Sequence, residues 1–143
     1  MNILITSHST LCIGLVNAYE MLVPTDATKI YAVPFIDEGI SEFRGHLNET
    51  FAKLAEDGKV LILADLLGGS PYNEANLIYQ QHQDSVRLLA GVNFPMLVEV
   101  GQYVQDGDNL DEAARIGLEA GRAGVIQAEP LVDVDNDSDE ELF

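Results

Sequence analysis

The chain has 143 residues, of which 47% are apolar, 24 are acidic and 7 are basic, giving a formal net charge of −17. This length buries one sizeable core but is short for two, so we expect a single domain. Nucleic acids and anionic membrane surfaces are excluded as preferred partners, because both are bound chiefly through Lys and Arg; a basic protein partner fits better.

Strands and helices alternate in the first half of the chain. Residues 2–6 form a short β-rich run, and residues 10–22 carry apolar residues at helical spacing. Residues 29–34 predict a second strand. A helix is expected over residues 41–56, with Ser41 as its N-terminal cap.

The second half continues the same rhythm. Residues 59–65, KVLILAD, are almost uninterrupted apolar, which is typical of a strand covered on both faces. The further expected elements are a helix at 71–82, a strand at 85–91, helices near 94–105 and 110–123, and an edge strand at 124–128. This order predicts an α/β fold, a single-domain open sheet that is mostly parallel and has helices on both faces.

In such a sheet the binding site lies beyond the carboxyl ends of the strands. His8 stands at this point after the first strand, and Asp65 ends the third. Because parallel strands bring these ends to one edge, we expect the two side chains to meet. A carboxylate that accepts from one ring N–H fixes the tautomer and leaves the other nitrogen free as a nucleophile. The pair therefore indicates covalent catalysis by histidine, with an incidental loop histidine as the alternative.

A glycine-rich turn, ADLLGGSPYN at residues 64–73, follows the third strand. Gly68 and Gly69 permit positive φ and a close approach of the backbone to a ligand, Ser70 is a candidate helix cap, and Pro71 suits the first helical turn. A helix start presents unpaired N–H groups that favour an anion such as phosphate. The turn is neither a Walker motif nor G-x-G-x-x-G, and a purely structural role is equally compatible with it.

Other reactive side chains are expected outside this site. His46 and His82 are predicted to lie on the surface, and the single Cys12 to pack in the core. A lone cysteine agrees with a reducing compartment. The first residues lack the features of a secretory signal and no apolar run reaches the length of a membrane span, so a cytoplasmic protein is expected.

The last residues, 129–143, are predicted to form an acidic, disordered tail. Asp133, Asp135 and Asp137 alternate as in a calcium loop. However, Ser138 stands where that loop needs glycine, and the chain stops before the twelfth-position glutamate. A solvated tail that binds no metal is the favoured interpretation.

Three segments carry a resemblance to a known family: ILITSHS, ILADLLGGSPYNEAN and LLAGVNFPMLVEV. In this order they resemble the IIA domain of the mannose-family bacterial sugar phosphotransferase system. The resemblance extends to about residue 128, which sets the expected domain at residues 1–128. It implies a phosphotransferase in which His8 accepts a phosphoryl group from the phosphocarrier protein HPr and passes it to a IIB component for sugar uptake and phosphorylation.

The resemblance also implies roles for the neighbouring residues. Asp65 matches the aspartate that orients the histidine, and Ser70 matches the serine near the phosphoryl group. We expect N–H groups of the turn formed by Gly68, Gly69 and Ser70 to hold the phosphoryl oxygens. This scheme requires no metal and no cofactor.

Further expectations concern partners. The IIB component should be a separate polypeptide, the membrane IIC and IID components should act indirectly, and residues 124–128 should be exchanged between the subunits of a homodimer. The family pattern often has Gly-Trp or similar where this chain has Ser9-Thr10, and an aromatic residue where it has Leu67. These positions border the site and bear on the choice of partner.

Three alternatives remain open at this point. A related phosphoryl acceptor serves the dihydroxyacetone kinase system and shares a first strand that ends in histidine, although the GGSPYN turn argues against it. A regulatory module would be phosphorylated on His8 and pass the group to no IIB component. A receiver-like domain phosphorylated on aspartate should have an acidic cluster where this chain has Thr6-Ser7-His8.

Overall fold

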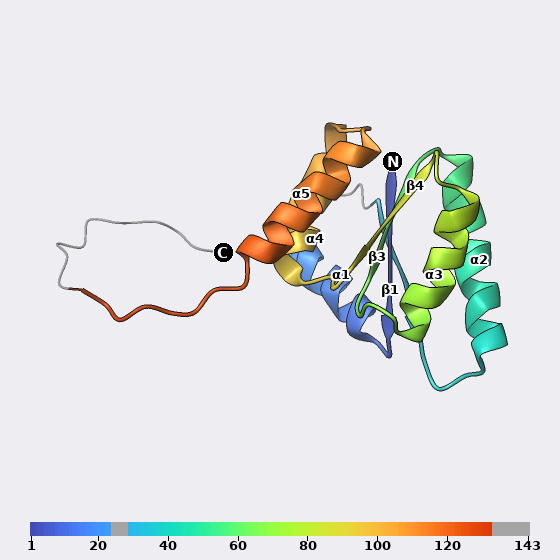
Figure 1. Ribbon diagram of the computed structural model, residues 1–143, viewed down its shortest axis with the longest axis horizontal. Coiled ribbons are helices and arrows are strands. Elements are labelled where there is room, and N and C mark those ends of the chain that lie inside the picture. Colours follow the sequence, from blue (N-terminus) through green and yellow to red (C-terminus); the bar gives the residue numbers. More distant parts are fainter. Residues whose placement is uncertain (24–28, 133–143) are drawn as a thin grey trace.

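The computed structural model describes residues 1–23 and 29–132 (Figure 1). All strands of its four-stranded sheet are parallel, in the order β2-β1-β3-β4. The strands are β1 (Asn2–His8), β2 (Ile30–Phe35), β3 (Val60–Ala64) and β4 (Val86–Ala90). The helices are α1 (Leu11–Leu22), α2 (Ile40–Glu56), α3 (Ser70–Gln81), α4 (Phe94–Asp106) and α5 (Leu110–Ala123). The predicted single-domain α/β fold is confirmed.

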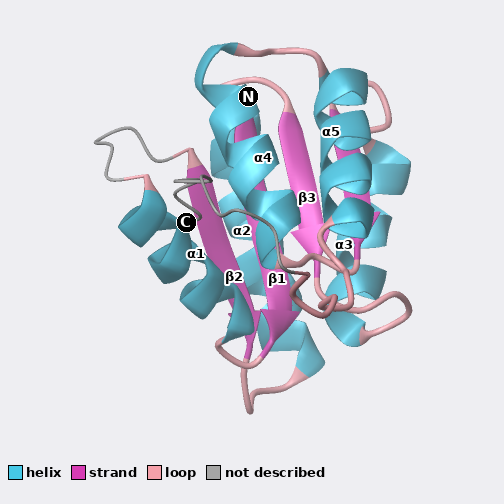
Figure 2. Ribbon diagram, turned by 90° about the vertical axis from the view of Figure 1, so that its left-hand side faces the viewer, coloured by secondary structure: helices cyan, strands magenta, loops and turns pink. Residues whose placement is uncertain are grey.

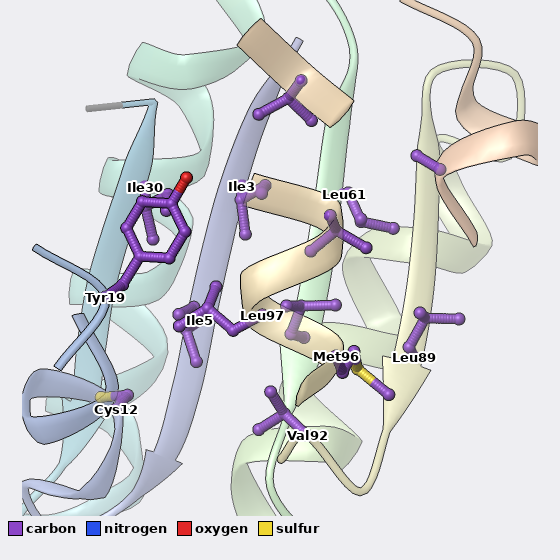
Figure 3. Close-up of a cluster of buried hydrophobic side chains, with 14 of the residues drawn as sticks. Ile3, Ile5, Cys12, Tyr19, Ile30, Leu61, Leu89, Val92, Met96 and Leu97 are labelled. Carbon is purple, nitrogen blue, oxygen red and sulfur yellow. The ribbon is translucent and has the colours of Figure 1, made fainter. Parts of the chain in front are cut away.

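Helices cover both faces of the sheet, with α1, α4 and α5 on one side and α2 and α3 on the other (Figures 1 and 2). Successive strand side chains point to opposite faces, so each strand contributes to two cores. Ile3 and Leu61 pack with α1, α4 and α5 (Figure 3), whereas Leu4 and Ile62 pack with α2 and α3. This explains why the central strands are apolar at nearly every position.

The helix caps differ from the expectation at two serines. Ser41 and Ser70 were expected to cap α2 and α3, but neither helix start has a side-chain cap hydrogen bond. The cap residues are Gly39 and Gly69, whose backbones are extended. Ser41 and Ser70 already lie inside their helices, where a side-chain oxygen no longer stands before the first unpaired N–H groups. Both cap predictions are wrong.

The expected edge strand at residues 124–128 is absent from the described chain. After α5 the chain runs on without regular structure to residue 132, and it leaves the domain there (Figure 1). Its side chains are exposed, with Ile126 at 83%. Because this segment lies away from the sheet, it has no neighbouring strand with which to form backbone hydrogen bonds. Its exchange between subunits stays a prediction. Of the predicted acidic tail at residues 129–143, residues 129–132 are exposed and without regular structure, and the rest, which carries the calcium-loop pattern, lies outside the described residues.

Three side chains predicted to stand outside the site do so. Cys12 is fully buried, and this burial raises the pKa of its thiol. His46 and His82 are exposed, and the His82 ring packs on Phe51 with ring centroids 5.0 Å apart. No helix within residues 1–23 and 29–132 has both the length and the apolar content that a bilayer crossing needs.

Candidate active site

The carboxyl ends of β1 and β3 bring His8 and Asp65 together. His8 is the last residue of β1, and Asp65 directly follows the last residue of β3. The register pairs Thr6 with Ala64, so Asp65 is level with the residue before His8. The strands run in the same direction, so both ends lie at one edge of the sheet (Figure 2). The sheet topology thus makes neighbours of residues far apart in sequence.

One carboxylate oxygen holds His8 at two points. The His8 Nδ1 lies 2.8 Å from Oδ2 of Asp65, and the His8 backbone N–H donates to the same oxygen at 2.9 Å. The Asp65 side chain is 9% exposed and that of His8 is 47% exposed. A carboxylate facing Nδ1 keeps the ring proton there, so the neutral ring has its lone pair on Nε2. The sequence-predicted pair is formed, with a nucleophilic nitrogen opposite the carboxylate.

The second oxygen of Asp65 is unpaired. Oδ1 is buried, and within the described residues it has no hydrogen-bond partner. No Lys or Arg side chain forms an ion pair with Asp65 in this part of the chain. The negative charge of the carboxylate can therefore stabilise a positive charge that develops on the His8 ring.

The residues of the glycine turn have three different roles. Gly68 has φ +83°, which only glycine adopts without strain, and its carbonyl accepts from Asn73 Nδ2 at 3.1 Å. The Gly69 N–H donates to the Leu66 carbonyl at 3.1 Å, so the turn itself uses a donor that we expected to hold an anion. The Ser70 N–H, at the start of α3, has no acceptor in the described chain. Ser70 is the better-placed donor.

Gly69 lies directly against the His8 ring. A Cβ atom at Gly69 would stand 2.7 Å from His8 Cε1 and 3.4 Å from Nε2. Atoms at the first of these distances overlap, so the ring can hold its place only beside a residue without a side chain. Gly69 is thus a steric support for His8, a role that the sequence alone did not indicate.

We expect Gly69→Ala to slow any reaction at His8 by about tenfold to a hundredfold, because a methyl group displaces the ring from Asp65. The backbone of Gly69, at φ −72°, suits alanine, so the fold should persist. The matched control is Gly45→Ala, where a Cβ meets nothing within 4 Å. Rates of covalent labelling of His8 measure the effect; equal rates in the two variants would refute the steric role.

Sequence reasoning missed two residues beside His8. Phe35 ends β2, its carbonyl accepts the Ser9 N–H at 2.7 Å, and its ring meets the His8 ring edge-on with centroids 6.3 Å apart. Ser7 Oγ accepts the Cys12 N–H at 2.8 Å and so ties the start of α1 to β1. The carboxyl-end rule that selected His8 also applies to Phe35, but an apolar side chain gave no chemical signal.

Ser9 carries backbone strain, because it adopts φ +50° without being glycine. Ser9→Gly should therefore raise the free energy of unfolding by about 0.5–1 kcal/mol, the strain relieved less the added freedom of the unfolded chain. Ser41→Gly, inside α2, should instead lower it by about 0.5 kcal/mol. Denaturant unfolding of both variants measures the difference, and a loss of stability in both would show that the Ser9 conformation is unstrained.

The family model and the relatives compared below are all described as components of a phosphotransferase system (PTS). A protein-family model described as the PTS system fructose IIA component (EIIA-man) matches residues 2–116. The chain is 40% identical to the PTS system mannose-specific EIIAB component of Escherichia coli (strain K12) over 86 residues, which are 59% of this chain and 26% of that protein. The match thus spans about a quarter of the length of the mannose-specific relatives.

Two further matches cover a larger share of the length of the matched protein. The PTS system fructose-specific EIIA component of Bacillus subtilis (strain 168) is 32% identical over 101 residues, which are 70% of this chain and 68% of that protein. The solved structure of the mannose/sorbose-specific IIA subunit of the phosphotransferase system from Enterococcus faecalis superposes with a TM-score of 0.75 at 26% identity, over 92% of this chain and 96% of that one.

Proposed function

The chain belongs to the EIIA-man family of phosphotransferase-system IIA components, and on this premise we propose that His8 carries a phosphoryl group from HPr to a IIB component. The observation that carries the proposal is the 2.8 Å contact of His8 Nδ1 with Asp65 Oδ2, which leaves Nε2 as the nucleophile of a half-exposed ring. The protein would thus be a cytoplasmic phosphotransferase that links HPr to sugar uptake and phosphorylation.

The chemical step follows from this geometry. The Nε2 lone pair attacks phosphorus in line, the new N–P bond forms as the bond to the donor breaks, and the donor atom keeps that electron pair. The His8 ring becomes positively charged and keeps its proton on Nδ1, facing the Asp65 carboxylate. The free Ser70 N–H and the positive end of α3 are available to the phosphoryl oxygens. In the second step a nucleophile of the next protein attacks the phosphorus, the N–P bond breaks, and Nε2 of His8 keeps that electron pair.

Exposed apolar side chains around His8 favour a protein as the phosphoryl donor. Leu11, Ile36, Leu66 and Leu67 are 51%, 48%, 58% and 71% exposed, and all stand just beyond the carboxyl ends of the strands. Apolar side chains clustered at a surface are typical of docking sites for proteins. The net charge of −17 favours a basic partner surface around such contacts.

The proposed function is tested by incubating the protein with phosphoenolpyruvate, enzyme I and HPr and measuring the mass of the intact protein. We expect one added phosphoryl group, lost after brief acid treatment as a phosphohistidine would be, and its transfer to an added IIB component. No added mass, under conditions that label a known IIA component, would refute the function. Labelling without transfer to any IIB component would favour the regulatory alternative.

We also propose a homodimer in which residues 124–128 of each subunit add a strand to the partner's β4. Of the two sheet edges, that of β2 is blocked. The carbonyls of Lys29 and Phe35 accept hydrogen bonds from the β1 side, so Pro34 belongs to the alternate set that faces outward. Proline has no N–H to donate there, and such an edge resists further pairing.

The family match over residues 2–116 and the end of α5 at Ala123 support a domain that spans residues 1–128.

We expect Ile126→Asp to weaken this dimer by at least about tenfold, because a carboxylate would be buried on strand exchange. Ile126 is 83% exposed in the single chain, so the subunit fold should not change. The matched control is Met21→Asp on α1, a residue that is 85% exposed and lies outside the exchanged segment. Sedimentation equilibrium measures the dissociation constant; a monomeric wild type, or a dimer unaffected by Ile126→Asp, would disprove the exchange.

A further inference from the structure

An ion pair joins α2 to α3. These two helices lie side by side on one face of the sheet (Figure 1). Glu74 is 8% exposed, and its side chain is as buried as that of Asp65, each being 9% exposed. Arg44 holds both of its oxygens, with Nε donating to Oε2 at 2.8 Å and Nη2 to Oε1 at 3.0 Å. This bidentate geometry fixes the orientation of both groups as well as their separation.

Stability alone is a poor reason for such a pair. The Glu74 side chain is 9% exposed and that of Arg44 49% exposed, so the desolvation of the carboxylate and the screening of the guanidinium by water both reduce what their attraction adds to stability. The hydrogen bonds that Arg44 donates to Glu74 raise the pKa of the Arg44 guanidinium, which therefore stays charged. A fixed position for the two helices is what the bidentate pair adds beyond apolar packing.

The contacts of the pair lead back to His8 along both helices. On α2, Arg44 follows Phe43, whose ring packs on Phe35 with centroids 5.0 Å apart, and Phe35 meets the His8 ring at 6.3 Å. On α3, Glu74 lies one helical turn beyond Ser70, on the same side of the helix.

Gly69 completes the path from α3 to His8. It precedes Ser70 and stands against Cε1 of the His8 ring. The chain of contacts from His8 through α2, the ion pair and the first turn of α3 thus returns to His8. A shift of α3 relative to α2 would move Gly69 and the Ser70 N–H with respect to the ring.

We propose that Arg44 and Glu74 are positioning residues for phosphoryl transfer, which together fix the first turn of α3 against the His8 ring. The inference rests on the proposed function of His8. Neither residue touches the reacting atoms; both act through Gly69 and Ser70. Loss of the pair should lower the transfer rate at saturating HPr and leave the KM for HPr largely unchanged, because the apolar side chains exposed around His8 are not altered.

Two variants separate positioning from folding. Arg44→Met/Glu74→Leu removes both charges and preserves volume, so stability should be kept. Arg44→Lys keeps a charge beside Glu74 but cannot bind it through two donors. We expect both variants to transfer the phosphoryl group about tenfold more slowly than the wild type at saturating HPr. The control is Lys53→Met/Glu49→Leu, which removes an exposed ion pair within α2 and should leave the rate unchanged.

The experiment measures the rate by rapid quench, the free energy of unfolding, and the NMR signals of His8 Cε1–H and the Ser70 amide. A wild-type rate in Arg44→Met/Glu74→Leu, or a rate loss that only follows the loss of stability, would overturn the proposal. Failure of the proposed function would be separate: the wild type would not be phosphorylated. In that case shifted His8 and Ser70 signals in both variants would still support positioning, and unchanged signals would overturn it.

Discussion

His8→Ala is expected to abolish phosphoryl acceptance. The variant removes the only nitrogen nucleophile at the carboxyl ends of β1 and β3 in the described chain, and the buried carboxylate of Asp65 is a poor substitute at 9% exposure. The fold should survive, because the His8 side chain is half-exposed and the bond from its backbone N–H to Asp65 needs no imidazole. We expect the free energy of unfolding to change by about 1 kcal/mol or less.

The other two histidines provide matched controls for this variant. His46 and His82 are exposed, and within the described residues neither forms a hydrogen bond or an ion pair with Asp65. His46→Ala and His82→Ala should each take up one phosphoryl group at the wild-type rate. Intact-protein mass after incubation with phosphoenolpyruvate, enzyme I and HPr measures all three variants. Normal labelling of His8→Ala, or loss of label in either control, would move the site elsewhere.

Asp65→Asn is expected to accept the phosphoryl group about a hundredfold to a thousandfold more slowly, as when a preorganised charge is lost from a site. The amide oxygen can take the place of Oδ2, which accepts both from His8 Nδ1 and from the His8 backbone N–H. The ring geometry should therefore persist. What disappears is the negative charge that balances the imidazolium during transfer.

The amide nitrogen of the same variant would occupy the place of Asp65 Oδ1, which is buried without a partner. An unpaired buried NH₂ group costs about 1–3 kcal/mol, so some loss of stability should accompany the slower reaction. Rapid-quench kinetics, measured without denaturant at a temperature at which both proteins are fully folded, separates the two effects. Asp84→Asn, an exposed residue at the opposite end of the sheet, is the control. A wild-type rate in Asp65→Asn would show that the carboxylate has no electrostatic role.

The meeting of His8 with Asp65 was predictable because it depends only on strand order and direction. Apolar runs located the strands to within one or two residues, and parallel strands have their carboxyl ends at one edge. The Arg44–Glu74 pair was not predictable, because it joins residues 30 positions apart through side-chain orientations that no local pattern encodes. The predicted caps at Ser41 and Ser70 are wrong for a related reason: the backbone conformation places the caps at Gly39 and Gly69, one or two residues earlier.

The double hydrogen bond from His8 to one oxygen of Asp65 has a consequence for repeated turnover. A half-exposed histidine would otherwise sample several rotamers, and arresting it would cost about 0.5–1.5 kcal/mol whenever a partner docks. Here the χ angles of His8 are already restricted when the chain folds. The entropy of this side chain is lost once, during folding, and each later encounter begins with the imidazole already aimed.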